Sequence, residues 1–456
     1  MPDASSLIAD LQETVELVTD PEVLATYRHD QAPESLVPAG VPAAMARPRD
    51  TAQVQAAVRA AAKHGVPIVP RGAGSGLSGG ANAIDGCLVL CMERMDELLA
   101  IEPDSLSARV QPGVINATLG AAARELDLHY APDPASVEFS TLGGNVATNA
   151  GGLCCVRYGV TREALLGLEV VLADGRAIRL GHATRKSSAG YDLAALFCGS
   201  EGTLGVVTEA TLRLSPAPPV GATLAASFPS LGAAGDAVAR IRRAFTPSLL
   251  ELMDRTTIQA VEQMAPQGLD EEVDALLFAR SDAPGAAAGE EIERIASLCE
   301  DAGASLAAVT DELAEGRMLM NARRLAYPAL ERMGTTILDD VCVPLGGIVP
   351  LLDGIERIAQ RHRLTIGTFG HAGDGNMHPT IVFDPADADA IEQARLAFDE
   401  IVALALGLGG TCTGEHGVGL LKRGHLATEL GPARRLHQQI KSALDPAGVM
   451  NPGKAI

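Results

Sequence analysis

Along the first half of the chain, apolar residues occur either at the spacing of one helix face or in short continuous runs. The segment TAQVQAAVRAAAKHG (51–65) has the spacing of an amphipathic helix, with Thr51 as its N-cap and Gly65 just after its end. Short apolar runs predict strands at 66–70, 86–92, 107–113 and 202–214, and a helix is expected at about 114–126. Residues 132–152 are small and glycine-rich, so we expect a loop there.

The pattern changes near the middle of the chain. Residues 168–180 predict a hairpin, with Asp174-Gly175 as a two-residue type I′ turn. The clustered prolines of 215–221 stop regular structure and mark a candidate domain boundary. Beyond it, Ala-rich stretches predict helices at 230–245, 285–300 and 387–407, and strands are expected near 335–344 and 364–383.

These elements predict an α+β protein, and a length of 456 residues predicts more than one domain. We expect a helical N-terminal segment at 1–35 and a first domain at 36–216. A second α+β domain is expected at 217–425, and the C-terminal segment 426–456 is expected to return to the first domain.

Composition excludes several classes of protein. A net charge of −21 disfavours binding to nucleic acid or to an anionic membrane surface. No stretch approaches the ~20 apolar residues of a membrane span, and residues 1–20, with no Lys or Arg, do not resemble a secretory signal or transit peptide. The eight cysteines contain no CxxC pair. We therefore expect a soluble cytoplasmic protein.

A glycine-rich loop, RGAGSGLSGGA (71–81), directly follows a predicted strand. Gly74, Gly76 and Gly79 match GxGxxG, but no helix opens at the third glycine, so the Rossmann context is missing. Bare N–H groups in such a loop can converge on a diphosphate, and Arg71 would add positive charge. A flexible turn would have the same composition, and both interpretations remain open at this point.

Two histidines flank a predicted turn in GTFGHAGDGNMHPTIVF (367–383). With Asp374-Gly375 as a two-residue turn, His371 would stand directly opposite His378 on one face of the hairpin, where two imidazoles can chelate a metal. Two buried histidines bonded to backbone would give the same pattern. In TCTGEHGVG (411–419), Glu415 and His416 point to opposite sides of an extended segment, so one of them can supply a third ligand. Two histidines and one carboxylate leave open positions, as a catalytic metal requires.

The glycine-rich segments carry a family resemblance. VPRGAGSGLSGGA, PDP…STLGGNVATNAGG and FCGSEGTLGVVTEATLRL resemble the FAD-binding domain of the vanillyl-alcohol-oxidase (PCMH) type. The resemblance implies a two-domain α+β flavoprotein, with residues 36–216 binding FAD and residues 217–425 forming a substrate (cap) domain that carries the metal site. Residues 70–81 contain no His, so the FAD is expected to be non-covalent. The cofactor-binding residues implied are Arg71, Gly72, Ala73, Gly74, Ser75, Gly76, Leu77, Ser78, Pro134, Thr141, Gly144, Asn145, Thr148, Ala150, Gly151, Gly152, Glu201, Gly205, Val206 and Asn451.

HAGDGNMH and CTGEHGVG together resemble the flavin-linked D-2-hydroxy acid dehydrogenases, over nearly the whole chain. This family includes cytochrome-type D-lactate dehydrogenase, the glycolate oxidase flavin subunit and D-2-hydroxyglutarate dehydrogenase. The resemblance implies His371, His378 and Glu415 as ligands of Zn or Mn, and His416 as the catalytic base. It also implies Arg323, in ARRLAYPA, as a catalytic residue that binds the substrate carboxylate, with Tyr327, Asn376 and Thr380 as further substrate residues.

The substrate choice depends on departures from the hydroxyglutarate branch. Tyr327 stands where that branch carries Thr, and Leu338 stands where it carries Lys. Because Leu338 cannot pair a second carboxylate, D-lactate is favoured. Glycolate oxidation with partner chains and D-2-hydroxyglutarate oxidation remain alternatives, as do alkyl transfer on the same fold and a non-catalytic flavin subunit. The electron acceptor, whether cytochrome, quinone or electron-transfer flavoprotein, stays open, as does the oligomeric state, a homodimer included.

Overall fold

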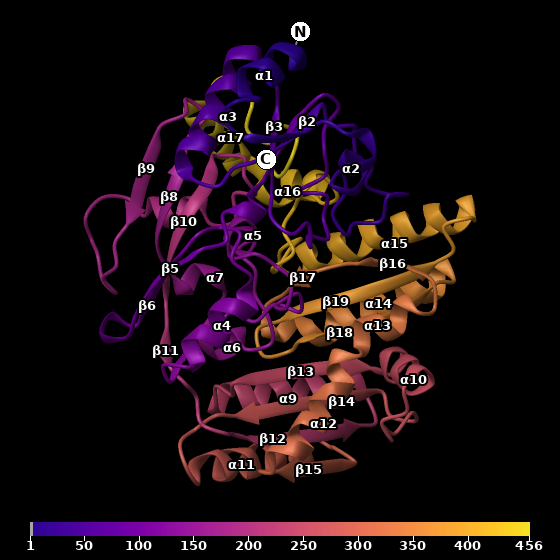
Figure 1. Cartoon of the computed structure of the whole chain (residues 1–456). Coiled ribbons are helices and arrows are strands. Elements are labelled where there is room, and N and C mark those ends of the chain that lie inside the picture. The colour runs from indigo at the N-terminus through magenta and orange to yellow at the C-terminus, as the bar shows by residue number, and fades with distance from the viewer. Residues whose placement is uncertain (1–2) are drawn as a thin grey trace. The chain divides into compact units, whose positions relative to one another are not determined.

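Residues 3–456 are described by a computed structural model of the chain. They divide into two units, which are described separately (Figure 1). The first unit contains the chain up to Gly151 together with Gly159–Ala217 and Glu415–Ile456. The second contains Gly152–Tyr158 and Pro218–Gly414, whereas the sequence predicted a second domain at 217–425.

The first unit has two main sheets. One has the order β1-β2-β4-β3, in which β2, β3 and β4 are parallel; the bounds are β1 (Glu16–Val18), β2 (Ala44–Arg47), β3 (Ile68–Arg71) and β4 (Leu88–Cys91). The other is antiparallel with the order β5-β6-β10-β8-β9, comprising β5 (Leu98–Glu102), β6 (Ser107–Val110), β8 (Leu165–Val171), β9 (Ala177–Gly181) and β10 (Val206–Arg213). A small third pair joins β7 (Leu128–His129) to β11 (Ser215–Pro216).

Short helices surround these sheets. They are α1 (Ala4–Leu11), α2 (Pro21–Thr26), α3 (Thr51–His64), α4 (Asn116–Arg124), α5 (Leu142–Thr148), α7 (Thr161–Ala164), α8 (Leu193–Phe197), α16 (Arg423–Leu430) and α17 (Arg434–Leu444). Three single turns of 3₁₀-helix also belong here: Met92–Arg94, Pro103–Ser105 and Gly431–Ala433. The N-terminal segment, predicted to be helical, also contributes strand β1, which pairs antiparallel with β2.

Helix α3 shows how the apolar period determines local structure. Its buried residues Val54, Ala57, Val58 and Ala61 recur at the spacing of one helix face, as predicted. The predicted N-cap was wrong: Asp50 caps the helix by accepting from the Gln53 N–H at 2.8 Å. The Thr51 hydroxyl instead donates to Glu169 at 2.6 Å.

Two predictions about glycine-containing segments were wrong in part. Helix α5 lies inside the segment predicted as a loop, because Thr141 caps it by accepting from the Gly144 N–H at 3.3 Å. The β8–β9 hairpin exists, but five residues, 172–176, connect its strands. Only Gly175 in this connection has a positive φ, whereas a type I′ turn needs positive φ at both central residues.

The second unit is built on one antiparallel sheet of eight strands. Its order is β15-β12-β14-β13-β18-β19-β16, and β17 also pairs with β19. The strands are β12 (Ala222–Phe228), β13 (Leu249–Asp254), β14 (Ala275–Ser281), β15 (Leu306–Thr310), β16 (Thr335–Leu338), β17 (Val341–Cys342), β18 (Thr365–His371) and β19 (Asn376–Phe383). Nearly every residue of β13, β18 and β19 is buried, so these strands occupy the core of the sheet.

Three helices of this unit, at 231–244, 287–301 and 388–407, lie where the sequence predicted them. The helices of the unit are α6 (Cys155–Tyr158), α9 (Leu231–Ala244), α10 (Arg255–Met264), α11 (Ala287–Asp301), α12 (Leu313–Arg324), α13 (Ala326–Glu331), α14 (Ile348–His362) and α15 (Ala388–Gly407), with a 3₁₀ turn at Leu345–Gly347. Helices α10 and α14 pack against β18, and α13 and α15 pack against β19. Among the described residues, no helix combines the length and hydrophobicity needed to cross a bilayer.

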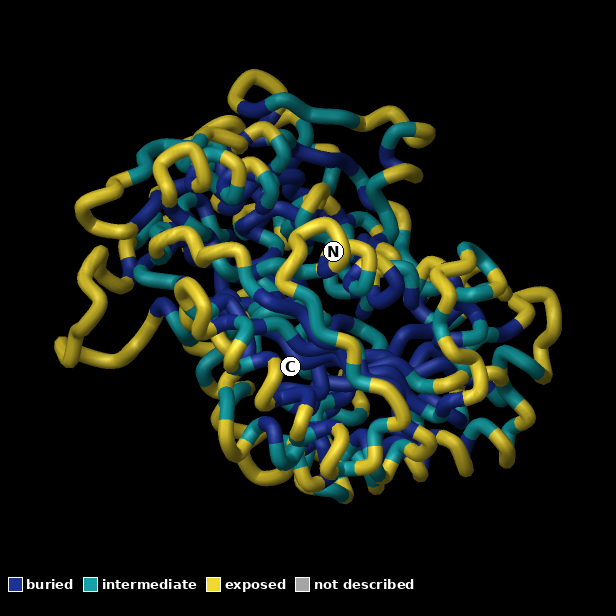
Figure 2. The backbone as a smooth tube through the Cα atoms, turned by 90° about the horizontal axis from the view of Figure 1, so that it is seen from below, coloured by how far each residue is buried: buried dark blue, intermediate teal, exposed yellow. Residues whose placement is uncertain are grey.

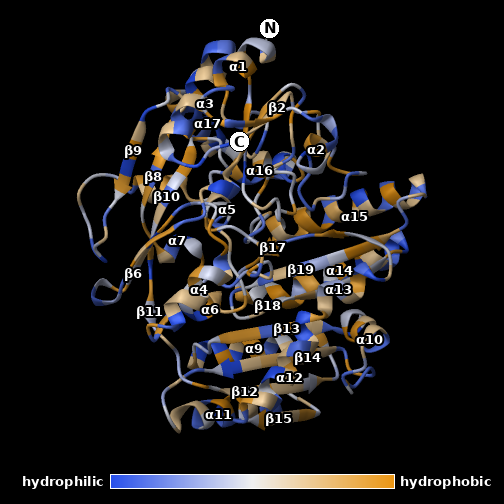
Figure 3. Cartoon of the chain, viewed as in Figure 1, coloured by the Kyte–Doolittle hydropathy of each residue, from blue (hydrophilic) through white to orange (hydrophobic). Residues whose placement is uncertain are grey.

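Buried and hydrophobic residues are concentrated in the strands, and exposed residues in the loops. Figure 2 colours the chain by burial and shows exposed chain at its outer loops. Residues 181–193 are exposed throughout. Strands β8 and β13 are coloured mainly hydrophobic in Figure 3, as their sequences LLGLEVV and LLELMD require. The predicted α+β class is therefore confirmed, with both units built on sheets that bury apolar side chains.

The β18–β19 hairpin has a different register from the one predicted. Four residues, 372–375, connect the strands, and the N–H of Gly375 donates to the carbonyl of His371 at 3.0 Å. His371 therefore faces Asn376, and His378 faces Phe369. The two histidines still share a face, because Asn376 and His378 are two residues apart on one strand.

Gly375 is the position on which this turn depends. Its φ is +88°, and a Cβ there would overlap the carbonyl oxygen of Val343. We predict that Gly375→Ala lowers the free energy of unfolding by about 2–4 kcal/mol, because both the conformation and the space disfavour a side chain. Urea unfolding followed by circular dichroism measures this change.

Gly346→Ala is the matched control for that substitution. Gly346 has a negative φ, and nothing lies within 4 Å of a Cβ added there. The control is expected to leave the free energy of unfolding within about 1 kcal/mol of the parent. Equal effects of the two substitutions would contradict the structure of the turn.

Candidate active site

A buried carboxylate joins two of the predicted site residues in the second unit. Glu251 lies on β13, and its side chain is 0% exposed. Its Oε1 is 2.7 Å from Nδ1 of His371, and its Oε2 accepts from both Nε and Nη2 of Arg323 at 2.8 Å. Strand register explains the first contact: β13 pairs with β18 through Leu252 and Gly370, and one further step places Glu251 opposite His371.

Arg323 is buried, although an Arg near the end of a helix is ordinarily expected to point into solvent. Its guanidinium carbon lies 4.7 Å from the centre of the Phe369 ring, a cation–π distance. The Phe369 ring lies 5.6 Å from that of His378, and the rings of His378 and His371 meet edge to face at 5.1 Å. The hairpin face therefore brings both histidines and the arginine into one side-chain group.

A second buried carboxylate, Asp340, lies behind His378. Oδ1 of Asp340 is 3.7 Å from Nδ1 of His378 and accepts from the side-chain amide of Asn376 at 2.8 Å. Oδ2 accepts from the Thr413 hydroxyl at 2.7 Å and from the Gly414 N–H at 3.0 Å. Asp340 thus attaches the 411–414 segment to the hairpin and lies beside the His378 ring.

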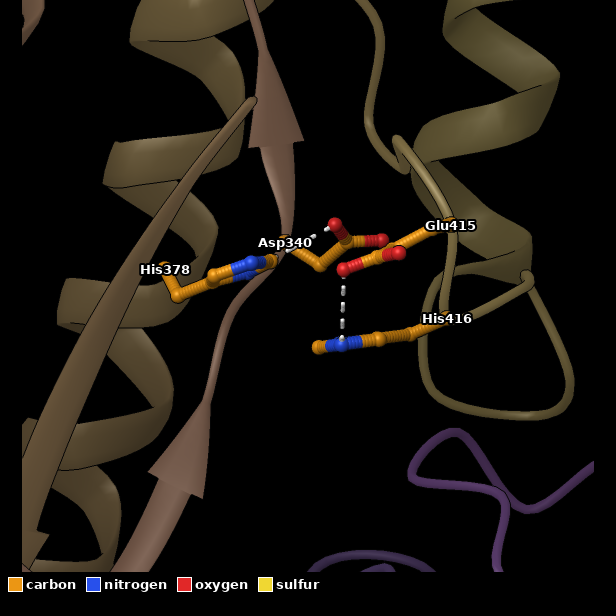
Figure 4. A group of neighbouring side chains, drawn as sticks. All are labelled: Asp340, His378, Glu415 and His416. Carbon is orange, nitrogen blue, oxygen red and sulfur yellow. Dashed lines mark ion pairs between the residues drawn. The ribbon is translucent and has the colours of Figure 1, made fainter. Parts of the chain in front are cut away.

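Glu415 and His416 follow Gly414 directly, where the chain passes from the second unit back into the first. Asp340, His378, Glu415 and His416 each offer one ligand atom, and these atoms lie within 4.8 Å of one another (Figure 4). Imidazole nitrogens and carboxylate oxygens suit Zn or Mn, so this donor set fits a divalent metal. His371 is outside this group of four, although its ring packs against that of His378.

The other predicted substrate residues lie on or beside the same strands. Thr380 is fully buried on β19, where it pairs with Leu338 of β16, and its hydroxyl lies 3.3 Å from the carbonyl oxygen of His378. The Tyr327 hydroxyl is 3.2 Å from that of Thr336, and burial raises the pKa of Tyr327 to about 12. Tyr327 is therefore a neutral hydrogen-bonding group at ordinary pH.

The first unit contains a cavity beside the glycine-rich loop. It has a volume of about 650 Å³ and is lined by four of the predicted cofactor-binding residues, Arg71, Gly72, Ala73 and Thr141, among others. A Cβ at residue 72 would overlap the Thr141 hydroxyl, and one at residue 74 would overlap the Arg71 guanidinium. The glycines are thus needed for the close approach of these side chains.

Arg71 supplies positive charge to this cavity. Its side chain is 7% exposed, and burial lowers its pKa. Within residues 3–456, its Nε and Nη1 have no hydrogen-bond partner, and the same is true of Nδ2 of Asn145. Buried donors without protein acceptors fit an anionic ligand such as a diphosphate, because burial of unpaired N–H groups otherwise costs free energy.

Several predicted cofactor residues form hydrogen bonds within the first unit. The carboxylate of Glu201 accepts from the N–H groups of Val418 and Gly419, both at 2.8 Å, while the Ser78 hydroxyl donates to the carbonyl of Gly417 at 2.8 Å. The side-chain amide of Asn451 donates to the carbonyls of Gly80 and Glu201. These bonds fix the chain that follows His416 against the glycine-rich loop.

The remaining predicted cofactor residues lie outside the group that lines the cavity. Backbone carbonyls of three of them accept hydrogen bonds: Gly76 from the Gln31 N–H, Gly144 from the Thr148 hydroxyl and Ala150 from the Thr161 hydroxyl. Gly205 and Val206 lie at the start of β10, and Gly152 belongs to the second unit. Ser75, Leu77, Pro134 and Gly151 are not among the residues that line this cavity.

Sequence reasoning missed Glu251 and Asp340. Glu251 is the single charged residue inside the apolar run LLELM, and Asp340 is the second residue of the Asp339-Asp340 pair that follows the strand TTIL. An isolated carboxylate in a buried strand is itself a signal, because such a group needs partners inside the protein. The identity of those partners could not be read from the sequence.

Two family models match the chain. The model described as FAD binding domain matches residues 42–181, and that described as FAD linked oxidases, C-terminal domain, matches residues 217–455. The glycolate oxidase subunit GlcD of Bacillus subtilis (strain 168) is 42% identical over 433 residues, which cover 94% of this chain and 91% of that protein. D-lactate dehydrogenase of Archaeoglobus fulgidus is 34% identical over 458 residues, covering 99% of both chains.

Solved structures share the fold at lower identity. 4-ethylphenol oxidase from Gulosibacter chungangensis has a TM-score of 0.81 at 22% identity, covering 100% of this chain and 98% of that one. p-Cresol methylhydroxylase has a TM-score of 0.82 at 18% identity, covering 99% and 96%. These matches confirm the expected flavoprotein fold. The chain belongs to the family of FAD-linked oxidases and is an FAD-linked oxidoreductase.

Proposed function

We propose that this protein oxidises a small 2-hydroxy acid to the 2-oxo acid with FAD and a divalent metal, and that D-lactate is the substrate. The convergence of His378, Glu415, His416 and Asp340 on one point carries the proposal. Relatives named D-lactate dehydrogenase and glycolate oxidase subunit support the reaction class.

The reaction removes the hydroxyl proton and a hydride from the substrate carbon. We assign the metal to His371, His378 and Glu415, where a bound divalent cation would lower the pKa of the substrate hydroxyl. His416 is the residue to take the hydroxyl proton, as a neutral imidazole can. FAD supplies the acceptor for the hydride when bound, and Arg71 with the glycine-rich loop is the group we assign to its diphosphate.

Arg323 is the residue we assign to the substrate carboxylate. A planar guanidinium binds a carboxylate through two parallel hydrogen bonds. Leu338 is apolar and 9% exposed, so it offers no cation to a second carboxylate. This difference favours a monocarboxylic acid over 2-hydroxyglutarate.

Glycolate is the second candidate substrate. The relative from Bacillus subtilis, named a glycolate oxidase subunit, is 42% identical to this chain, above the 33% and 34% of two proteins named D-lactate dehydrogenase. The word subunit in that name also supports partner chains. As electron acceptor we propose a cytochrome, a quinone or an electron-transfer flavoprotein, and we propose a cytoplasmic location.

The substrate is tested by anaerobic reduction of the bound flavin. We predict that D-lactate bleaches the visible flavin absorbance faster than L-lactate, glycolate or D-2-hydroxyglutarate, because apolar Leu338 favours a monocarboxylic acid and two relatives are named D-lactate dehydrogenase. Stopped-flow absorbance with each acid in turn measures the rates. Faster bleaching by glycolate would replace D-lactate with the second candidate, and a flavin that none of the acids reduces would contradict the proposed function.

The metal site is tested by His378→Ala. We predict that this variant keeps its FAD but loses turnover by about 100-fold or more, because a ligand of the proposed metal is removed. Chelation of the parent protein should have the same effect, and added Mn²⁺ or Zn²⁺ should restore only the parent. Normal turnover by the variant would exclude a metal role for His378.

Arg71→Met tests the assignment of the first-unit cavity. We predict that FAD dissociates about 10–100-fold more readily from this variant, since a charge-assisted hydrogen bond to a phosphate is lost. Flavin fluorescence released on dilution measures the dissociation constant. Arg185→Met, at an exposed position, is the matched control; equal FAD retention by both variants would contradict the assignment.

A further inference from the structure

We propose that Glu251 is a positioning residue that holds a metal ligand and the substrate-binding arginine with the two oxygens of one carboxylate. The proposal rests on the proposed function, because it takes His371 as a ligand and Arg323 as the carboxylate-binding residue. The same Glu251 side chain would therefore position both the metal ligand His371 and the substrate-binding Arg323, and so link them.

The first half of the link fixes the ring of His371. Oε1 of Glu251 lies 2.7 Å from Nδ1 of His371, so Nδ1 carries the proton of this hydrogen bond. Nε2 is then the ring nitrogen with a lone pair for a metal. A carboxylate behind a ligating histidine fixes the tautomer and ring orientation and makes the imidazole a stronger ligand.

The second half of the link fixes the guanidinium of Arg323. Oε2 of Glu251 accepts from Nε and Nη2, both at 2.8 Å, which uses one edge of the guanidinium plane. The end of the plane, formed by Nη1 and the second proton of Nη2, has the geometry that binds a carboxylate. The centre of the Phe369 ring lies 4.7 Å from the guanidinium carbon of Arg323. This contact and the two bonds to Glu251 together fix the direction in which the free end of the guanidinium group points.

Glu251 is paired with an opposite charge at a fully buried position. Arg323 is 6% exposed and Glu251 is 0% exposed, so the two opposite charges form a buried pair. Both oxygens of Glu251 are engaged by these partners, which argues against Glu251 as a metal ligand itself. Asp340 does not link two site residues in this way. Its oxygens accept hydrogen bonds from Asn376, Thr413 and Gly414 beside His378.

Glu251→Gln separates this role from a purely structural one. A glutamine amide offers one acceptor oxygen, and its NH₂ group faces a donor on either His371 or Arg323. The full-length, FAD-loaded protein is stripped of metal with a chelator and titrated with Mn²⁺, with free Mn²⁺ followed by electron paramagnetic resonance. We expect the dissociation constant for Mn²⁺ to rise about 10–100-fold and the KM for the reducing 2-hydroxy acid to rise as well.

Two further variants make the result specific. Glu291→Gln is the matched control, because Glu291 also accepts a side-chain hydrogen bond in this unit, from Ser281 at 3.0 Å, and has no contact with the site. It should leave both constants unchanged. Arg323→Lys keeps the charge opposite Glu251 but loses the planar fork, so it should raise KM and leave the Mn²⁺ constant within about 2-fold of the parent value.

The outcomes distinguish the two proposals. If the parent and His378→Ala bind Mn²⁺ equally weakly, the proposed metal site is wrong, and this inference fails with it. If the parent binds Mn²⁺ through His378 but Glu251→Gln has the parent's constants, only the role of Glu251 is overturned. If Glu251→Gln does not fold, Glu251→Asp replaces it, because it keeps the charge but is one methylene too short to reach both partners. The Mn²⁺ dissociation constant and KM are again expected to rise, and constants equal to those of the parent would overturn the proposal.

Discussion

A carboxylate that is removed from water needs donors inside the protein, and this requirement organises the candidate site. Glu251 and Asp340 are both fully buried, on or next to strands of one sheet. Glu251 is satisfied by His371 and Arg323, and Asp340 by donors from the hairpin and the 411–414 segment. Removing a donor would leave a buried charge uncompensated, at a cost of roughly 3–5 kcal/mol. The side chains that surround the two carboxylates are therefore held in one arrangement.

The same pairing gives the histidines their chemistry. Each imidazole faces a carboxylate through Nδ1, at 2.7 Å for His371 and 3.7 Å for His378. The shorter contact is a hydrogen bond, which leaves Nε2 of His371 as the nitrogen suited to a metal, whereas the longer one is an ion-pair contact beside His378. The first unit contains a buried cation, Arg71, beside a cavity of about 650 Å³. Its Nε and Nη1 have no protein acceptor among the described residues.

Local signals in the sequence predict local structure well and long-range pairing poorly. The helices at 231–244 and 388–407 follow from their apolar period, and the shared face of His371 and His378 follows from strand alternation. The register of the hairpin does not, because the turn has four residues instead of two. Likewise, His371 and Arg323 are 120 and 72 residues away from Glu251, and no local pattern specifies such pairs. The family motifs indicated site residues in both units, but not the carboxylates that orient them.

The most direct test of this account is anomalous X-ray diffraction from crystals of the FAD-loaded protein soaked with Mn²⁺. The account predicts one strong anomalous peak, at about 2.0–2.3 Å from ring nitrogens of His371 and His378 and from the carboxylate of Glu415. The second oxygen of Glu251 would remain on Arg323, unchanged by the metal. A peak bound by Asp340 and His416 without His371 would contradict the assigned ligand set, and no peak at the hairpin would contradict the metal-dependent chemistry as a whole.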